Sequence, residues 1–296
     1  MSLLLLALLF AAADTFPVFP SELVNFAPYS ENPLFTGAGP GHWDEKIRER
    51  GWIMREGDMY HMWYSGYELP ESGMKKLGYA TSSDGVHWTR HPDNPVHAED
   101  WVEDMMVVKD GDTYFMFAEG LHDRTWLFTS TDRIHWTRKW MLDIRKVNGD
   151  PLPEGPFGTP TVLKENGKWH LLYERDDEAV WLAVSDDLKV WTNVQDEPVI
   201  RRGPEPYDRT MIALNQVVKH EDRYYAYYHA TCPENGSDRW TMNVAVSDDL
   251  VHWTKYPQNP IIPIDHSSGI LVHDGNVYRM YCMHPSVKLF FPTLSE

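Results

Sequence analysis

The pattern S-x-D-x-x-x-W-T occurs four times in this sequence, and it limits the fold more strongly than any other feature. The copies occupy residues 82–89, 130–137, 185–192 and 247–254, at intervals of roughly 50 residues, a period typical of propellers and solenoids. Each copy follows an apolar run, so we expect its Ser and Asp to form a turn between two strands and to bond nearby backbone N–H groups. These Asp residues are therefore predicted to be structural, and the Trp residues are predicted to pack between blades.

A second element precedes each copy and occurs once more near the end of the chain. It consists of an apolar strand, a Gly-containing or acidic turn and an aromatic strand, which is the composition of a β-hairpin. The aligned aromatic residues of the five hairpins are Tyr60, Tyr114, Trp169, Tyr224 and Tyr278. Five first hairpins and four second hairpins predict an all-β fold, a five-bladed β-propeller of four-stranded blades whose last blade lacks one strand. The stretch around residues 23–26 is the expected donor, so that an N-terminal strand closes the last blade and removes exposed sheet edges.

The chain has 296 residues, 42% of them hydrophobic, and no linker or change of composition divides it. We therefore predict a single propeller domain over residues 14–296. The apolar run at residues 3–10, followed by three alanines, predicts a signal peptide over residues 1–13 and hence a secreted or periplasmic protein, with a buried N-terminal strand as the alternative. A net charge of −17 disfavours nucleic acids and anionic membrane surfaces as partners.

The two cysteines, Cys232 and Cys282, cannot form a disulfide framework or a cysteine-based metal site. Their spacing leaves both a single disulfide and two free thiols open. No zinc signature is present, so the sequence predicts no metal ligands and requires no cofactor.

The strings MWYSGYE, LGYATSSDGVHW and DNPV, with their later counterparts, resemble five-bladed-propeller glycoside hydrolases and related enzymes. These are the arabinanase/xylosidase, invertase/levansucrase, α-1,3-anhydrogalactosidase and β-mannoside phosphorylase groups, and the resemblance covers about residues 30 to 291. It implies acids near the start of the innermost strand of successive blades, around a pocket on the propeller axis. It also allows a structural central ion such as calcium.

Counting ten residues back from the aligned aromatics tests each blade for such an acid. The positions reached are Arg50, Asp104, Thr159, Leu214 and Ser268. Asp104 matches the second-blade Asp to which the resemblance assigns tuning of the acid's pKa or stabilisation of the transition state. Arg50 stands where the first-blade Asp is expected, and Thr159 stands where the third-blade Glu is expected.

Five residues after each of these aromatics, the second strand of the blade returns to the end of the blade at which the first strand began. The positions are Ser65, Glu119, Glu174, His229 and Met283. Cleavage of a glycosidic bond needs one protonated carboxyl and one ionised carboxylate. We assign Glu174 as general acid, Asp44 or Asp208 as base or nucleophile, and Asp104 as electrostatic partner, with structural ion pairs to arginine as the alternative for each.

The remaining candidates are polar or aromatic side chains predicted to bind the substrate. They are Arg50, Glu119, His229, Trp43, Trp101, Arg209 and His284. Together these features predict a glycoside hydrolase that acts on an oligo- or polysaccharide in a central funnel. A glycoside phosphorylase and a non-catalytic carbohydrate-binding propeller remain the alternatives, the latter favoured by Arg50 and Thr159 at expected acid positions.

Overall fold

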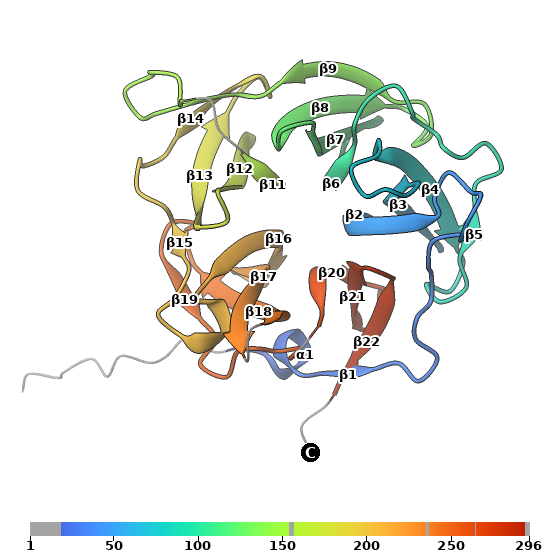
Figure 1. Cartoon of the computed structure of the whole chain (residues 1–296). Coiled ribbons are helices and arrows are strands. Elements are labelled where there is room, and N and C mark those ends of the chain that lie inside the picture. The colour runs from blue at the N-terminus through green and yellow to red at the C-terminus, as the bar shows by residue number, and fades with distance from the viewer. Residues whose placement is uncertain (1–18, 154–156, 235–236, 264, 294–296) are drawn as a thin grey trace, which may run out of the picture.

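The structure of the protein is a computed structural model that describes residues 19–153, 157–234, 237–263 and 265–293. Five sheets surround a central axis, and in each blade the strands follow chain order from the inside outward, except that the outermost strand of the last blade comes from the N-terminus. The predicted five-bladed β-propeller with four-stranded blades is thus confirmed (Figure 1). The predicted signal peptide, residues 1–13, lies outside the described residues.

The strands follow one another around the ring. Blade one consists of β2 (Lys46–Glu56), β3 (Met59–Tyr67), β4 (Lys76–Ser82) and β5 (Thr89–Arg90). Blade two consists of β6 (Glu103–Asp110), β7 (Thr113–Gly120), β8 (Arg124–Ser130) and β9 (Thr137–Met141). Blade three consists of β11 (Gly158–Glu165), β12 (Lys168–Arg175), β13 (Ala179–Ser185) and β14 (Val190–Asn193), with the short strands β10 (Asp143–Arg145) and β15 (Ile200–Arg201) added. Blade four consists of β16 (Met211–His220), β17 (Arg223–Glu234), β18 (Ser237–Ser247) and β19 (Trp253–Lys255).

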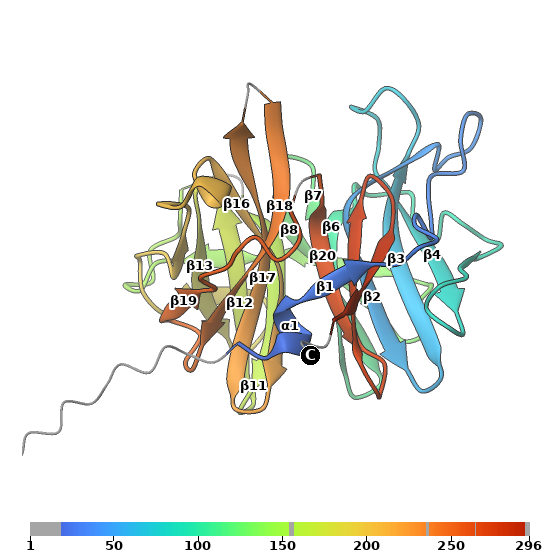
Figure 2. The ribbon, with the colours of Figure 1, turned by 90° about the horizontal axis from the view of Figure 1, so that it is seen from below.

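Blade five is completed by the N-terminus, as predicted. It consists of β20 (Ser267–His273), β21 (Tyr278–His284), β22 (Lys288–Pro292) and β1 (Phe26–Pro28). β1 pairs antiparallel with β22, and Figure 2 shows it beside the C-terminal strands. The donor strand begins later than expected, because Leu23 lies in the short helix α1 (Ser21–Val24). Leu23 is fully buried there, and its carbonyl accepts a hydrogen bond from the Tyr227 hydroxyl at 2.9 Å.

The repeated turn has the structural role predicted for it. In its first copy, Ser82 Oγ accepts the N–H of Gly85 at 2.9 Å. Asp84 Oδ1 accepts the N–H groups of Val86 and His87, each at 2.8 Å. The other three copies form the same backbone bonds. Each turn therefore satisfies its own backbone donors.

The tryptophans of the repeat pack between blades, also as predicted. The Trp136 ring meets Trp63 of blade one edge to face, with 6.1 Å between ring centroids. The Trp191 ring meets Phe117 of blade two in the same way at 6.2 Å. Each of these contacts links a blade to the second strand of the preceding blade, in the geometry that aromatic pairs prefer.

Cys282 is buried in β21 and carries a free thiol. Burial raises the pKa of this thiol to about 12. The disulfide alternative is therefore not realised at Cys282. Within the ranges that the structure describes, no helix is long and apolar enough to cross a membrane.

Candidate active site

A β-bulge interrupts the innermost strand near the start of each of the first three blades. In β6, two residues, Asp104 and Met105, oppose a single residue of β7. A bulge changes the direction in which side chains point. Here the bulged residues have left-handed backbone angles, with φ of 45° at Asp104 and 42° at Thr159. In β2, three residues oppose one, and the residue with the equivalent backbone angle is Glu49, at φ 38°.

The count that aligned Arg50 with Asp104 is therefore wrong by one residue. The bulge of β2 contains one residue more than the bulge of β6, which displaces the count from the aromatic residue. Glu49 supplies an acid in the first blade, at the position where the resemblance implied one. In the third blade, Thr159 still stands at the position where the resemblance implied a Glu.

Arg50 has a different place from the predicted one. Its side chain is fully buried and reaches across the axis to the other innermost strands. Nη1 donates to the carbonyl of Asn215 at 3.0 Å, and Nη2 donates to the carbonyls of Pro160, at 2.8 Å, and Asp104. One guanidinium therefore connects blades one to four, and it lies among carbonyl oxygens of the kind that a central cation would need. Its terminal nitrogens are occupied by the protein itself, so the prediction that Arg50 binds substrate is not supported.

Glu119 and Glu174 converge on either side of Gly158. They come from the ends of β7 and β12, as the count along the second strands predicted. A Cβ at residue 158 would lie 2.6 Å from Glu119 Oε1 and would collide with Glu174 Oε1, so glycine is required for the two carboxyl groups to approach. Glu119 Oε1 also accepts the N–H of Thr159, and Glu174 Oε2 accepts the N–H of Asp177 at 2.7 Å.

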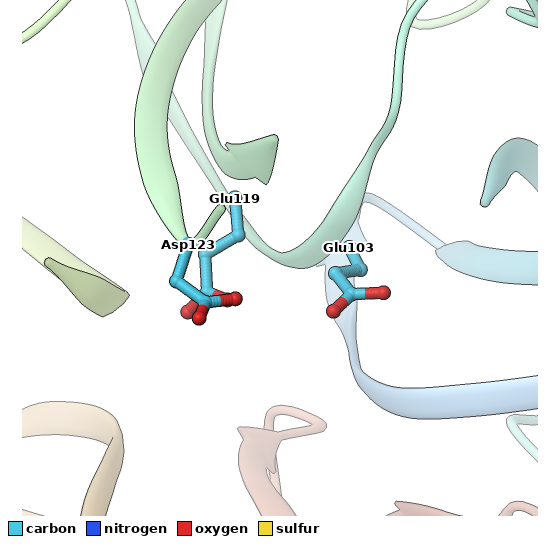
Figure 3. Close-up of side chains that lie close together, drawn as sticks. All are labelled: Glu103, Glu119 and Asp123. Carbon is cyan, nitrogen blue, oxygen red and sulfur yellow. The ribbon is translucent and has the colours of Figure 1, made fainter. Parts of the chain in front are cut away.

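A second group of acids joins Glu119, namely Glu103 and Asp123, and we call these three residues the acid triad (Figure 3). One oxygen of each lies within 4.8 Å of the others. Glu103 and Glu119 are buried, whereas Asp123 is exposed. Among the described residues, this triad has the oxygen geometry that could hold a divalent cation.

Burial raises the pKa values of the axial carboxyl groups. Burial is the largest cause of the rise at Asp104, and the negative charge of Glu49 is the second; together they raise the pKa of Asp104 to about 7. Burial and, after it, the negative charge of Asp104 raise the pKa of Glu103 to about 7. Burial and, after it, the negative charge of Asp177 raise the pKa of Glu174 to about 8. Burial is also the main reason why the pKa of Glu119 lies well above its usual value. Charges of one sign crowded in a low dielectric favour protonated forms. The funnel therefore holds carboxyl groups that can donate protons near neutral pH.

Two cations lie among these acids, and the protein already pairs both of them. Arg48 is bound to Glu49 at 2.9 Å and to Glu103 at 3.4 Å, and it also pairs with Glu71. Lys75 donates to the carbonyls of Gly73, at 3.0 Å, and Glu71, and its Nζ lies 4.2 Å from the centre of a tyrosine ring.

The count from the aromatics missed several residues of this site. They are Arg48, Glu103, Asp123 and Asp177, together with Glu49, which the count passed over by one position. The available signal was the pairing of adjacent acids, Glu103 with Asp104 and Asp176 with Asp177, at strand ends.

The two predicted histidines lie in the same region, and both are neutral. His284 Nδ1 accepts the N–H of Glu49 at 3.1 Å, and burial and then Arg48 lower its pKa. A neutral ring whose Nδ1 accepts must carry its proton on Nε2, so His284 can donate to a substrate hydroxyl. The His229 ring is buried against Trp240, with 4.9 Å between centroids, and burial and then Arg50 lower its pKa to about 3.

Asp44 and Asp208 are structural rather than axial, which corrects their assignment as base or nucleophile. Asp44 is 2% exposed and is paired with Arg90 Nε of β5 at 2.8 Å. Asp208, which ends the 3-10 turn η1 (Pro206–Asp208), is fully buried and paired with Lys255 of β19. Both partners lie on the outermost strands of their blades, so neither carboxylate joins the axial acids.

The last three predicted residues have different surroundings. Trp43 stacks on Tyr64 of blade one, with 5.9 Å between ring centroids. Arg209 is exposed in the loop after η1. Trp101 packs on Lys75, whose Nζ lies 4.9 Å from the ring centre, and of the three it lies nearest to the acid triad in sequence.

No family model matches this sequence. The chain is 25% identical over 232 residues to a 1,2-beta-oligomannan phosphorylase of Thermoanaerobacter sp., and the match covers 72% of this chain and 74% of that protein. A glycosyl hydrolase structure from Bacteroides ovatus superposes with a TM-score of 0.74 at 17% identity, covering 94% of this chain and 98% of that one. The structure of a β-1,2-mannobiose phosphorylase from Listeria innocua, in complex with β-1,2-mannobiose, gives a TM-score of 0.66 at 18% identity and covers 90% and 96% of the two chains.

The structural likenesses show the fold, and the sequence likeness shows that relatives of this chain process glycosides. The resemblance inferred from the sequence is thereby confirmed. The chain is a five-bladed β-propeller, and the structures that share its fold include glycoside hydrolases and mannoside phosphorylases.

Proposed function

We propose that this protein is a glycoside hydrolase that cleaves mannosidic bonds of oligosaccharides in its axial funnel. The observation that carries the proposal is the cluster of buried axial carboxyl groups, in which burial raises the pKa of Asp104 to about 7 and the pKa of Glu174 to about 8. The mannoside is proposed from the names of the relatives, which act on β-1,2-linked mannose.

The acids differ in burial and in ion pairing, and these differences allow separate roles as general acid and as base. Glu174 is buried and keeps its proton up to about pH 8, which suits a general acid that protonates the leaving oxygen. Burial raises the pKa of Glu49, but its ion pair with Arg48 at 2.9 Å favours the ionised form, and its side chain is 30% exposed and open to water. We assign Glu49 as the base that activates water and Asp104 as the group that tunes the charge between them.

Hydrolysis is preferred to phosphorolysis because the funnel offers little to an anion. A phosphate needs several convergent cations. Arg48 is already shared by three carboxylates, Lys75 donates to backbone carbonyls, and Arg50 is enclosed by carbonyls. A phosphate would meet the acid triad beside these three cations, which carboxylates and carbonyls already engage, whereas water would not be repelled.

The test is the release of mannose from β-1,2-mannobiose and longer β-1,2-mannooligosaccharides, with and without phosphate. We expect hydrolysis without phosphate, a fall of about 10²- to 10⁴-fold in kcat for Glu174→Gln and Asp104→Asn, and a decline of wild-type kcat above about pH 8, where Glu174 loses its proton. The matched controls are Asp112→Asn and Glu221→Gln, which remove single charges from exposed turns at the opposite end of the blades and should keep full activity.

Other outcomes would select the alternatives. Strictly phosphate-dependent formation of a sugar phosphate would make the protein a phosphorylase, as the names of its relatives suggest. Binding of the oligosaccharides without any turnover would make it a carbohydrate-binding propeller. Full activity in both Glu174→Gln and Asp104→Asn would overturn the proposed catalytic cluster.

A further inference from the structure

A pocket of about 390 Å³ opens at the rim of blade two, and nothing in the catalytic proposal uses it. We call it the rim pocket. It is lined by Asp100, Trp101, Gly120, Leu121, His122, Arg124, Trp126, Phe128, Arg138 and Met141.

The rim pocket lies next to the acid triad along the chain. Gly120 follows Glu119 directly, and His122 directly precedes Asp123. The turn between β7 and β8 therefore carries triad acids and pocket lining on the same few residues. The pocket and the triad are therefore linked through one turn, although the triad acids do not line the pocket.

The walls of the pocket form a fixed surface of aromatic and charged groups. The Trp126 indole packs so closely on Gly120 that a Cβ there would lie 2.8 Å from its Cδ1. The Arg138 guanidinium lies over the same indole, 4.5 Å from its centre, and is held by an ion pair with Asp100. A guanidinium stacked on an indole and tied to a carboxylate loses little freedom when a ligand binds, so the surface is preorganised.

The rim combines apolar exposure with hydrogen-bonding capacity. Leu121 is 56% exposed and Met141 is 40% exposed, so two apolar side chains face solvent at the rim. Asp100 offers acceptors and Arg138 offers donors beside them. A sugar ring matches this combination, because it has an apolar C–H face and an edge of neighbouring hydroxyls that both donate and accept.

We propose that the rim pocket is a distal sugar subsite, which makes this protein select oligosaccharides over disaccharides. The inference rests on the proposed function, because it takes the acid triad as the neighbourhood of the bond to be cleaved. A ring seated in the pocket against Leu121 and Arg138 is then a unit beyond the two that share that bond. Occupancy of the pocket adds binding that a disaccharide cannot obtain.

The experiment compares kcat/KM along the series of β-1,2-mannooligosaccharides from the disaccharide to the tetrasaccharide. We expect kcat/KM of the wild type to rise about tenfold along the series, through KM, which corresponds to the contribution of one well-packed ring. Arg138→Ala and Leu121→Ser should flatten this rise. Val147→Ser is the matched control, since Val147 is 52% exposed but lies outside the pocket, and it should keep the rise of the wild type.

A second readout separates this inference from the proposed function. Titration calorimetry of Glu174→Gln with the same sugars should show affinity that increases with chain length, and Arg138→Ala in that background should remove the increase. Length-dependent binding without turnover by the wild type would keep the subsite and reject the hydrolase. Hydrolysis with equal kcat/KM for all lengths would keep the hydrolase and overturn the subsite.

Discussion

Arg50 shows how far a single residue can organise this molecule. It comes from a bulge in β2, and its guanidinium bonds carbonyls of Asp104, Pro160 and Asn215 in the next three blades. Its backbone N–H also binds Asp104 Oδ1 at 3.0 Å, so the same residue positions a candidate catalytic acid. Stability and the geometry of the site therefore share one side chain.

We predict that Arg50→Met lowers the free energy of unfolding by roughly 3–5 kcal/mol, because buried carbonyls would lose their donors. The measurement is chemical denaturation, with Arg55→Met as the control. Arg55 lies on the same strand with a side chain 28% exposed and a single ion pair at 3.6 Å, so its loss should cost less than about 1 kcal/mol. Equal costs for the two variants would show that the axial bonds contribute little.

At the scale of the element, the repeated turn explains why the blades are alike. The fourth residue of each copy has a left-handed backbone angle, with φ of 73° at Gly85, 75° at Arg133, 64° at Leu188 and 68° at Leu250. Only the first copy uses glycine, the residue that adopts this angle without strain. In the other copies the Ser and Asp side chains hold the turn by bonding its N–H groups, and this fixes the start of the outermost strand.

We predict that Asp187→Ala lowers the free energy of unfolding by about 1 kcal/mol, the typical worth of a side chain that caps backbone N–H groups. Asp187 Oδ1 accepts two such groups, from Lys189 and Val190, each at 2.9 Å. The control is Asp186→Ala, which removes the same charge from a side chain 84% exposed with one long contact at 3.7 Å. Thermal unfolding of both variants checks the difference, and a larger loss in Asp186→Ala would contradict it.

The asparagines before the blade-entry prolines are a second shared element. Asn94 bonds both the N–H and the carbonyl of Tyr79 in β4, each at 2.9 Å. Asn259 does the same with Val244 in β18, at 3.0 and 2.9 Å. The motif that marks entry into a new blade therefore ties the connecting segment to the third strand of the blade just completed.

At the scale of the whole molecule, the axial carboxyl groups are crowded together in a protein that is already acidic. The net charge is −17, and the axial acids are held with their pKa values raised by burial. Such groups favour the native state while they are protonated and oppose it once they ionise. The acid cluster that supports catalysis therefore reduces stability at alkaline pH.

We predict that the free energy of unfolding falls as the pH rises from 6.5 to 8.5. In this range the unfolded chain has already lost these protons, whereas the native state holds protons on Glu103, Asp104 and Glu174 up to about pH 7 to 8. The unfolded state then binds fewer protons than the native state, so stability decreases with pH. Most of the range lies above the usual pKa of histidine, about 6.5, so the neutral His229 and His284 oppose the effect only near its lower end.

Thermal melts across this pH range, for the wild type and for Glu119→Gln, provide the measurement. Glu119→Gln removes a buried acid whose pKa lies well above its usual value, so its pH dependence should be flatter. The exposed Glu221→Gln should follow the wild type. A wild-type midpoint that rises with pH would show that the cluster is ionised throughout.

The sequence by itself determined the blade number, the turns and the closing strand, because these depend on local patterns that repeat along the chain. It also placed Glu119 and Glu174 correctly, since strand periodicity carries a count from an aromatic residue to the end of the same strand. Only the tertiary structure showed that Glu49, and not Arg50, is the first-blade counterpart of Asp104, because one extra residue in a bulge shifts the count from the aromatic residue by one position. It also showed that Asp44 and Asp208 form structural ion pairs. Their partners lie on outermost strands about 45 residues away, so no local sequence pattern reveals the pairing.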